Sequence, residues 1–326
     1  MKLKDMPDLF SSKSAIEQYY RCPQSWALKY LLGLNAVDDV NIAAAIGNVL
    51  HAGILEGFFL NGGNLTLMQK FAEGHRDYVK LEPDEELMVH CVLKGAEQSF
   101  RAFRDQITVI SVENKYKRDE QVGDKTVRHS VRSDMVYVYR SGGPPWVMDL
   151  KTTGRYLGKK GSKPWYWDRA VKTLETPYAI LELEKHLGTE LAGMDWQVVK
   201  LPKDKAERFN ENGKHHTREQ HIEWLAGKLG KNTNTWFPHL EIPRAEANPE
   251  AAIPDIDYIV RRMLADAQYF AEHGHLGKNR NACWDYARPC EYQPACFEGA
   301  DINDKKLYSL RTDRKPKNDN QNKDAA

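Results

Sequence analysis

The 326-residue sequence has few cysteines, little net charge and no Walker-type glycine-rich loop for cradling phosphate. Its formal net charge is only +1, so overall charge neither requires nor excludes a nucleic-acid partner, and any basic surface must be local. Without the glycine-rich loop, we expect no ATPase motor in the chain itself. With 41% hydrophobic and 29% charged residues, the composition is that of a soluble globular protein.

The sequence also lacks a long uninterrupted apolar run. Met1–Phe10 has no apolar core of the kind found in secretion signals, and the most apolar stretch, Ile42–Leu60, is interrupted by Asn48, His51 and Glu56. We therefore expect neither a signal peptide nor a membrane span. In the reducing compartment that this implies, grouped cysteines more often bind metal than form disulfides.

Hydrophobic periodicity predicts an α/β fold in which helices precede a strand meander. The Ser14/Glu17 spacing predicts a capping box for a first helix. Further helices are expected over Ile42–Leu60, Pro83–Gln106, Ala170–His186 and Pro254–Glu272, and strands over Ile107–Glu113, Val131–Tyr139, Trp146–Leu150 and Met194–Lys200. We expect one domain over residues 1–300, followed by a disordered polar tail over 301–326.

Acidic residues flank a predicted hairpin that turns at Ser141–Pro145. Asp149 and Lys151 are two residues apart on one strand and so point to the same face, and folding at the turn brings Asp134 near them. Two carboxylates that hold Mg²⁺ or Mn²⁺ beside an ammonium suit phosphodiester hydrolysis. From spacing alone, an ordinary exposed hairpin with a surface salt bridge is the simpler interpretation.

A glycine and a histidine on the preceding helix strengthen the catalytic interpretation. In Gly47-Asn-Val-Leu-His51, the glycine permits close approach of the helix to the sheet, and the imidazole can add a ligand to a divalent ion. A lone histidine there is more often a core residue. The G-x-x-x-H at His51, Asp134 and the Asp149–Lys151 strand follow one another in the right order, however, and this favours a catalytic metal site.

Four of the five cysteines form a second pattern. Cys283, Cys290 and Cys296 are clustered late in the chain, and Cys22 comes 261 residues before the first of them. Four thiolates fit either Zn²⁺ or an iron-sulfur cluster, and the spacing does not separate the two. Cys91 falls on an apolar helix face and is expected to pack in the core.

A basic and aromatic segment follows the catalytic strand. Arg155, Lys159 and Lys160 are interleaved with aromatic residues that include Trp165 and Trp167. Basic and stacking side chains suit single-stranded DNA, although a solvated loop with its aromatics in the core is equally compatible.

Taken together, these motifs resemble the RecB-like PD-(D/E)XK nucleases, over most of residues 12–299. The resemblance is carried by Tyr-Arg-Cys22-Pro with the trailing Tyr30-Leu-Leu-Gly-Leu, by the G-x-x-x-H at His51, and by the segments around Asp134 and Asp149-Leu150-Lys151-Thr. It implies a restriction-endonuclease-like core with a mixed central sheet, flanking helices and helical embellishment. It also implies metal ligation by His51, Asp134, Asp149 and the Leu150 carbonyl, a catalytic Lys151, and a helper role for Glu113 on the preceding strand.

The resemblance also bears on the cysteines and on a helix after the lysine strand. Iron-sulfur members of the family use one early and three late cysteines, which implies a [4Fe-4S] cluster joining the N- and C-terminal segments. The family's Q-x-x-x-Y is altered here: Tyr178 is present as a candidate DNA contact, but Leu174 holds the glutamine position and Glu175 follows it.

The resemblance implies a deoxyribonuclease that uses Mg²⁺ or Mn²⁺ in the cytoplasm of a bacterial or phage-infected cell. An exonuclease acting on single-stranded DNA or DNA ends, in recombination, repair or DNA processing, is favoured. The resemblance is compatible with a helicase or recombinase partner in trans, and it does not determine the oligomeric state. The alternatives are a structure-specific endonuclease for flapped or branched DNA and a non-catalytic DNA-binding adaptor.

Overall fold

The computed structural model describes residues 9–37, 42–154, 170, 173–202, 217–287 and 289–310. The chain divides into two compact units, and the expected domain over residues 1–300 therefore comprises both. Unit 1 consists of Met1–Asp39, Arg118–Ser130 and Pro254–Ala326, whereas unit 2 consists of Val40–Lys117 and Val131–Ile253.

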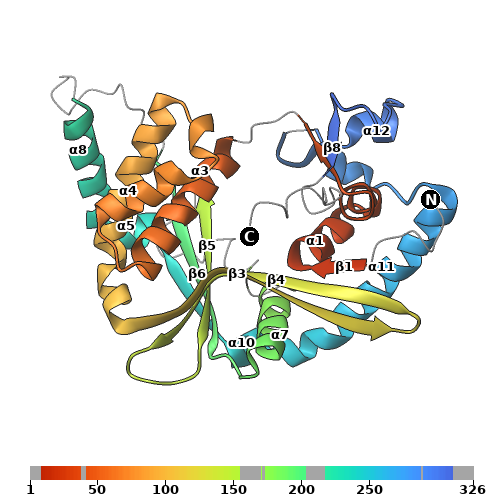
Figure 1. The fold of residues 1–326 in the computed structure, drawn as a ribbon, viewed down its shortest axis with the longest axis horizontal. Coiled ribbons are helices and arrows are strands. Elements are labelled where there is room, and N and C mark those ends of the chain that lie inside the picture. The colour runs from red at the N-terminus through yellow and green to blue at the C-terminus, as the bar shows by residue number, and fades with distance from the viewer. Residues whose placement is uncertain are drawn as a thin grey trace, which may run out of the picture. The chain divides into compact units, whose positions relative to one another are not determined.

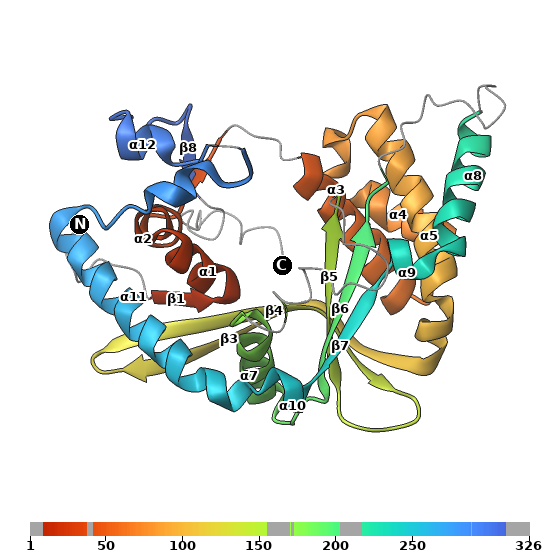
Figure 2. The same cartoon turned by 180° about the vertical axis from the view of Figure 1, so that it is seen from behind.

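Unit 2 holds a mixed sheet between two helical layers (Figures 1 and 2). The C-terminal part of strand β4 pairs antiparallel with β5, β5 pairs parallel with β6, and β6 pairs antiparallel with β7. The strands are β3 (Ile107–Val122), β4 (Lys125–Tyr139), β5 (Trp146–Thr153), β6 (Gly193–Lys200) and β7 (His239–Pro243). This mixed sheet with flanking helices confirms the predicted α/β class and is consistent with the PD-(D/E)XK fold.

Helices cover both faces of this sheet. The helices of unit 2 are α3 (Ile42–His51), η3 (Ala52–Leu60), α4 (Leu65–Gly74), η4 (Tyr78–Lys80), α5 (Pro83–Gln106), α7 (Glu175–Leu187), α8 (Arg218–Lys231), α9 (Thr233–Trp236), α10 (Arg244–Ala247) and η5 (Pro249–Ala252). Side-chain alternation separates the two cores. Met148 and Leu150 of β5 pack with α3, α4 and α5, whereas Val147 packs with α7.

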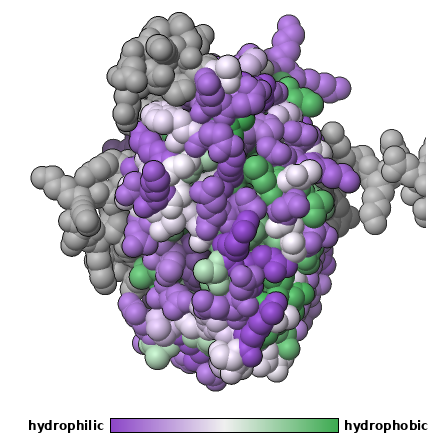
Figure 3. Space-filling view, turned by 90° about the vertical axis from the view of Figure 1, so that its left-hand side faces the viewer, coloured by the Kyte–Doolittle hydropathy of each residue, from purple (hydrophilic) through white to green (hydrophobic). Residues whose placement is uncertain are grey.

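The predicted helix Ile42–Leu60 is continuous but changes its winding, because α3 ends at His51 and a π-helix, η3, begins at Ala52. By length and composition it is the one described helix that would suffice to cross a membrane, yet 67% of its apolar window is buried within the protein. It is thus placed as a core helix. Figure 3 shows the side of the molecule that lies on the left in Figure 1. This side is mostly hydrophilic, with smaller hydrophobic patches.

Several predicted boundaries differ from the structure. Strand β3 continues nine residues past the predicted end at Glu113, because its charged residues pair with β4 and do not need a core to hold them in a strand. Helix α7 begins at Glu175, five residues later than expected, and places Pro177 in its first turn, where proline is tolerated. The bounds predicted for α5 are confirmed.

Unit 1 joins segments from both ends of the chain. Its elements are β1 (Leu9–Ser12), α1 (Lys13–Arg21), α2 (Pro23–Trp26), η2 (Ala27–Leu31), β2 (Leu34–Ala36), α11 (Ile253–His273), η6 (Arg280–Ala287), α12 (Gln293–Phe297) and β8 (Tyr308–Leu310), with β1 parallel to the N-terminal part of β4. The Tyr19 hydroxyl of α1 donates a 2.6 Å hydrogen bond to Asp266 of α11. The Tyr292 hydroxyl donates a 2.8 Å bond to the Leu34 carbonyl.

Two predictions for unit 1 are wrong. Helix α1 is capped by Ser12, whose hydroxyl accepts from the Ala15 N–H at 3.2 Å, and not by Ser14. The expected disordered tail was to begin at residue 301, but β8 lies within residues 301–310 and pairs antiparallel with β2. A three-residue strand offers no periodicity to read, and its pairing with β2 is stabilised by Tyr308, which packs in the core against Tyr292.

A buried carboxylate on β6 makes the stability of unit 2 depend on pH. Asp195 is 1% exposed, accepts hydrogen bonds from Gln197 and Tyr137, and feels the charge of Glu241. Burial is the largest influence, and it raises the pKa of Asp195 from 3.8 to about 7. Between pH 3.8 and about pH 7, Asp195 keeps its proton in the folded protein but has lost it in the unfolded chain. The free energy of unfolding therefore falls as pH rises through this range.

We predict that Asp195→Asn removes this penalty. The free energy of urea unfolding of the variant, relative to wild type, should rise between pH 4 and pH 8 by up to about 4 kcal/mol. Comparing the two proteins at each pH cancels the titration of all other groups. A difference that stays constant with pH would contradict the assignment.

Candidate metal centre

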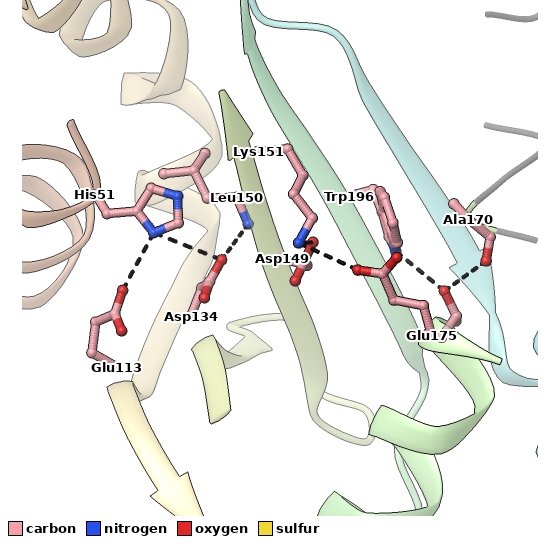
Figure 4. Close-up of polar contacts among 10 residues, drawn as sticks. His51, Glu113, Asp134, Asp149, Leu150, Lys151, Ala170, Glu175 and Trp196 are labelled. Atoms are coloured by element: carbon pink, nitrogen blue, oxygen red, sulfur yellow. Dashed lines mark hydrogen bonds and ion pairs between the residues drawn. The ribbon is translucent and has the colours of Figure 1, made fainter. Parts of the chain in front are cut away.

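Three side chains from three elements of unit 2 form a group able to hold a metal ion. His51, Glu113 and Asp134 each offer one ligand atom, and these atoms lie within 4.8 Å of one another. His51 Nδ1 lies 3.3 Å from Glu113 Oε1 and 3.9 Å from Asp134 Oδ2 (Figure 4). The two carboxylate oxygens are hard donors that suit Mg²⁺ or Mn²⁺, and the imidazole nitrogen is a borderline donor that Mn²⁺ accepts more readily than Mg²⁺.

Helix α3 brings His51 to the sheet because Gly47 lacks a side chain. A Cβ at this position would lie 2.8 Å from Thr152 Oγ1 on β5, closer than ordinary contact. The expectation that Gly47 permits close approach of the helix to the sheet is therefore confirmed.

Glu113 reaches the group through unusual backbone geometry. Its φ is 50°, in the left-handed region that costs a non-glycine residue about 1–3 kcal/mol. The carboxylate is paired with His51 and, at 3.6 Å, with Arg132. Although burial opposes its charge, the His51 hydrogen bond and the charges of His51 and Arg132 hold the pKa of Glu113 below its ordinary value. A strained backbone that aims a carboxylate at a polar group is typical of a functional site.

Asp134 is tied to the neighbouring strand. The β4–β5 register pairs Met135 with Met148, and the Leu150 N–H donates a 2.7 Å hydrogen bond to Asp134 Oδ2. Burial and the nearby charge of Asp149 raise the pKa of Asp134, although His51 and Lys151 act in the opposite direction. For His51, burial opposes the charged form, but Glu113 and Asp134 outweigh it and raise its pKa. A bound cation would therefore favour the deprotonated forms of both Asp134 and His51.

Lys151 and Asp149 belong to a second group beside the first. Lys151 Nζ lies 2.5 Å from Asp149 Oδ2 and 3.4 Å from Glu175 Oε1 (Figure 4). Burial opposes the charge of Lys151, but Asp149, Glu175 and Asp134 outweigh it and raise the lysine pKa well above its ordinary value. The prediction that Asp149 and Lys151 share a face of β5 is confirmed. Their catalytic and metal-binding roles stay predictions, as does the role of the Leu150 carbonyl.

A cavity of about 560 Å³ opens onto both groups. Asp134 and Lys151 both line it, which places a carboxylate of the first group and the ammonium of the second on one space large enough for a phosphodiester. Its other lining residues are Ala44, Gly47, Asn48, His51, Ala52, Glu56, His75, Glu113, Arg132, Leu150 and Thr152.

The predicted DNA contacts fall into two sets. Tyr178 lies on α7 and is 1% exposed, and its contact with DNA stays a prediction. Five further predicted contacts, Arg155, Lys159, Lys160, Trp165 and Trp167, lie outside the described residues.

The cysteines of the predicted cluster all lie in unit 1, while Cys91 is fully buried in the core of unit 2, as predicted. Burial, helped by the charges of Cys22, Cys290 and Cys283 and opposed by that of Lys278, raises the pKa of Cys296 to about 11. Within the described residues, however, these four cysteines do not form a group whose ligand atoms lie within 4.8 Å of one another.

Comparison with known proteins identifies the family of this chain. The family model described as "PD-(D/E)XK nuclease superfamily" matches residues 11–297. The chain belongs to the PD-(D/E)XK nuclease superfamily. This membership indicates a nuclease with DNA as its substrate, and the His51, Glu113 and Asp134 group accords with the divalent metals that this superfamily uses.

A search of curated protein sequences found no match. Among solved structures, one titled "Crystal structure of SSO0001" matches with 13% identity and a TM-score of 0.20, over 69% of this chain and 85% of that chain. A similarity this low says nothing further about the fold.

We predict that Asp134→Asn weakens Mn²⁺ binding by more than about 10-fold, because it removes one negative oxygen ligand. Isothermal titration calorimetry on the full chain measures this directly. Asp195→Asn is the matched control, since it neutralises another buried aspartate of the same sheet that does not line the cavity. Equal Mn²⁺ affinity in both variants would place the metal elsewhere.

Proposed function

We propose that this PD-(D/E)XK protein is a RecB-like, Mg²⁺- or Mn²⁺-dependent deoxyribonuclease that degrades single-stranded DNA or DNA ends as an exonuclease. The observation that supports this most is the shared cavity, in which the His51, Glu113 and Asp134 group lies beside Lys151. Recombination, repair or DNA processing is the setting that such an activity would serve, with a helicase or recombinase as a partner in trans.

The residues divide the chemical work. His51, Glu113 and Asp134, joined by Asp149 and the Leu150 carbonyl, would hold the cation. When bound, a divalent cation polarises the scissile phosphate and lowers the pKa of a coordinated water. The Lys151 ammonium lines the same cavity and is placed to orient the attacking water or to stabilise the charge that develops on phosphate oxygens.

We predict that Asp149→Ala lowers metal-dependent turnover of end-labelled linear single-stranded DNA at least about 100-fold. Wild type should degrade the linear substrate with Mn²⁺ and leave circular single strands intact. Cleavage of the circles would favour the alternative endonuclease of flapped or branched DNA. Unchanged turnover by Asp149→Ala would contradict the active-site assignment, and DNA binding without any turnover in wild type would favour the non-catalytic adaptor.

We also propose that Cys22, Cys283, Cys290 and Cys296 ligate a [4Fe-4S] cluster. All four thiols belong to unit 1, which joins the N- and C-terminal segments that carry them. Cys22 ends α1 in the N-terminal segment, whereas the Cys290 N–H donates a 2.7 Å hydrogen bond to the Cys283 carbonyl in the C-terminal segment. A cluster held by these residues would add a covalent link to a unit that already joins both segments through Tyr292 and Leu34.

We predict that anaerobically purified protein is brown, with broad visible absorption that dithionite bleaches. Cys290→Ser should lose this absorption and unfold at a lower temperature, because metal–thiolate bonds contribute to the folding free energy. Cys91→Ser is the matched control and should keep the colour. Colourless protein that contains zinc, or normal thermal stability in Cys290→Ser, would contradict the cluster.

A further inference from the structure

Glu175 is a buried carboxylate that the family motif does not account for. It stands at the first residue of α7, directly after the position where the related nucleases carry glutamine, and only 4% of the residue is exposed. Its Oε1 lies 3.4 Å from Lys151 Nζ on β5 (Figure 4). Burying a carboxylate is costly unless it is paired, so this contact has to be maintained by the surrounding structure.

The start of α7 is fixed against the sheet. The Thr176 hydroxyl donates a 2.7 Å hydrogen bond to the Ala170 carbonyl and accepts a 3.2 Å bond from the indole N–H of Trp196 on β6. The same Trp196 ring lies 5.3 Å from Lys151 Nζ. One tryptophan therefore contacts both the residue after Glu175 and the ammonium that Glu175 pairs with, so the helix start and the lysine are held in register.

Lys151 has two carboxylate partners on different elements, and this matters for Asp149. If Asp149 turns an oxygen toward a bound cation, the ammonium loses part of its nearest counter-charge, which lies at 2.5 Å. Neither Asp149 nor Glu175 lines the cavity that His51, Asp134 and Lys151 share, so Asp149 reaches a cation in that cavity only by such a turn. An ammonium has three N–H donors, and two carboxylates that anchor it leave one to point toward a phosphate or a water.

We propose that Glu175 is the positioning residue of Lys151. It stands one residue after the position where this chain lacks the family's glutamine, and it keeps the ammonium at the cavity wall while Asp149 binds the metal. This inference rests on the proposed nuclease function and assigns the specific task of one further residue within it.

Two other roles for Glu175 lead to different results. As a metal ligand of a second cation, it would change Mn²⁺ affinity or stoichiometry when replaced. As a purely structural charge at a helix start, it would change stability but not turnover by the folded enzyme. Replacing a positioning residue changes kcat but leaves KM for DNA and the Mn²⁺ affinity unchanged. The reason is that such a residue acts only on the group that contacts the reacting phosphate.

The test compares Glu175→Gln with Glu182→Gln in the full chain. Glu182 lies on the same helix, is 3% exposed and pairs with Lys185, which makes it a matched control for loss of a buried carboxylate. Glu175→Asp retains the charge on a shorter side chain and serves as the second variant should the amide fail to fold. The readouts are kcat and KM on linear single-stranded DNA, Mn²⁺ titration by calorimetry, and melting temperature.

We expect Glu175→Gln to lower kcat about 10- to 100-fold, the range typical of supporting groups, with KM and Mn²⁺ affinity within about twofold of wild type. Glu175→Asp should recover part of the loss, and Glu182→Gln should keep wild-type kcat. In a Lys151→Met background, Glu175→Gln should cause no further loss of the residual rate, because it acts through the lysine.

Each contrary result has a separate meaning. Wild-type kcat in Glu175→Gln, with Lys151→Met inactive, would overturn the positioning role and leave the nuclease assignment standing. A drop in Mn²⁺ affinity or stoichiometry would make Glu175 a ligand and also overturn it. Full activity in Lys151→Met would instead contradict the proposed function from which this inference starts.

Discussion

The candidate site depends on holding four carboxylates and two basic side chains close together. Glu113, Asp134, Asp149 and Glu175 gather about one strand, β5, where burial weakens the screening that water would provide. Lys151 and His51 offset part of this charge, but burial and the charge of Asp149 still raise the pKa of Asp134. The fold maintains this unfavourable arrangement, which a divalent cation would relieve. Pairs of like charge held close together in a cavity are typical of metal-dependent phosphodiester chemistry.

The surrounding architecture explains how such a site persists. The mixed sheet is packed on both faces, so β4, β5 and β6 hold their side chains in a rigid layer between two cores. Gly47 lets α3 approach β5, and the hydrogen bonds of Thr176 fix the start of α7. Strain at Glu113 is compatible with this scaffold, because the long β3–β4 pairing determines the path of the backbone on either side. Unit 1 gains its own cohesion from Tyr19, Tyr292 and Tyr308.

The sequence predicted those features that depend on local pattern. Helix α5, the β4–β5 hairpin and the shared face of Asp149 and Lys151 follow from periodicity and from one strong turn, and the structure agrees. Features that depend on tertiary contact were missed. A positive φ at Glu113 leaves no mark in the sequence, and the meeting of Glu175 with Lys151 depends on where α7 begins. Likewise, the burial of Tyr178 has no local signal, and the β2–β8 pairing joins segments that are far apart in the sequence.

The central claim is that the imidazole and carboxylates form one divalent-cation site. Pulsed electron paramagnetic resonance of bound Mn²⁺ tests it most directly, because an imidazole nitrogen ligand gives a resolved hyperfine coupling. Labelling the histidines with ¹⁵N should change this coupling, and His51→Ala should abolish it. A bound Mn²⁺ ion that shows no nitrogen coupling, or whose coupling survives in His51→Ala, would contradict the account.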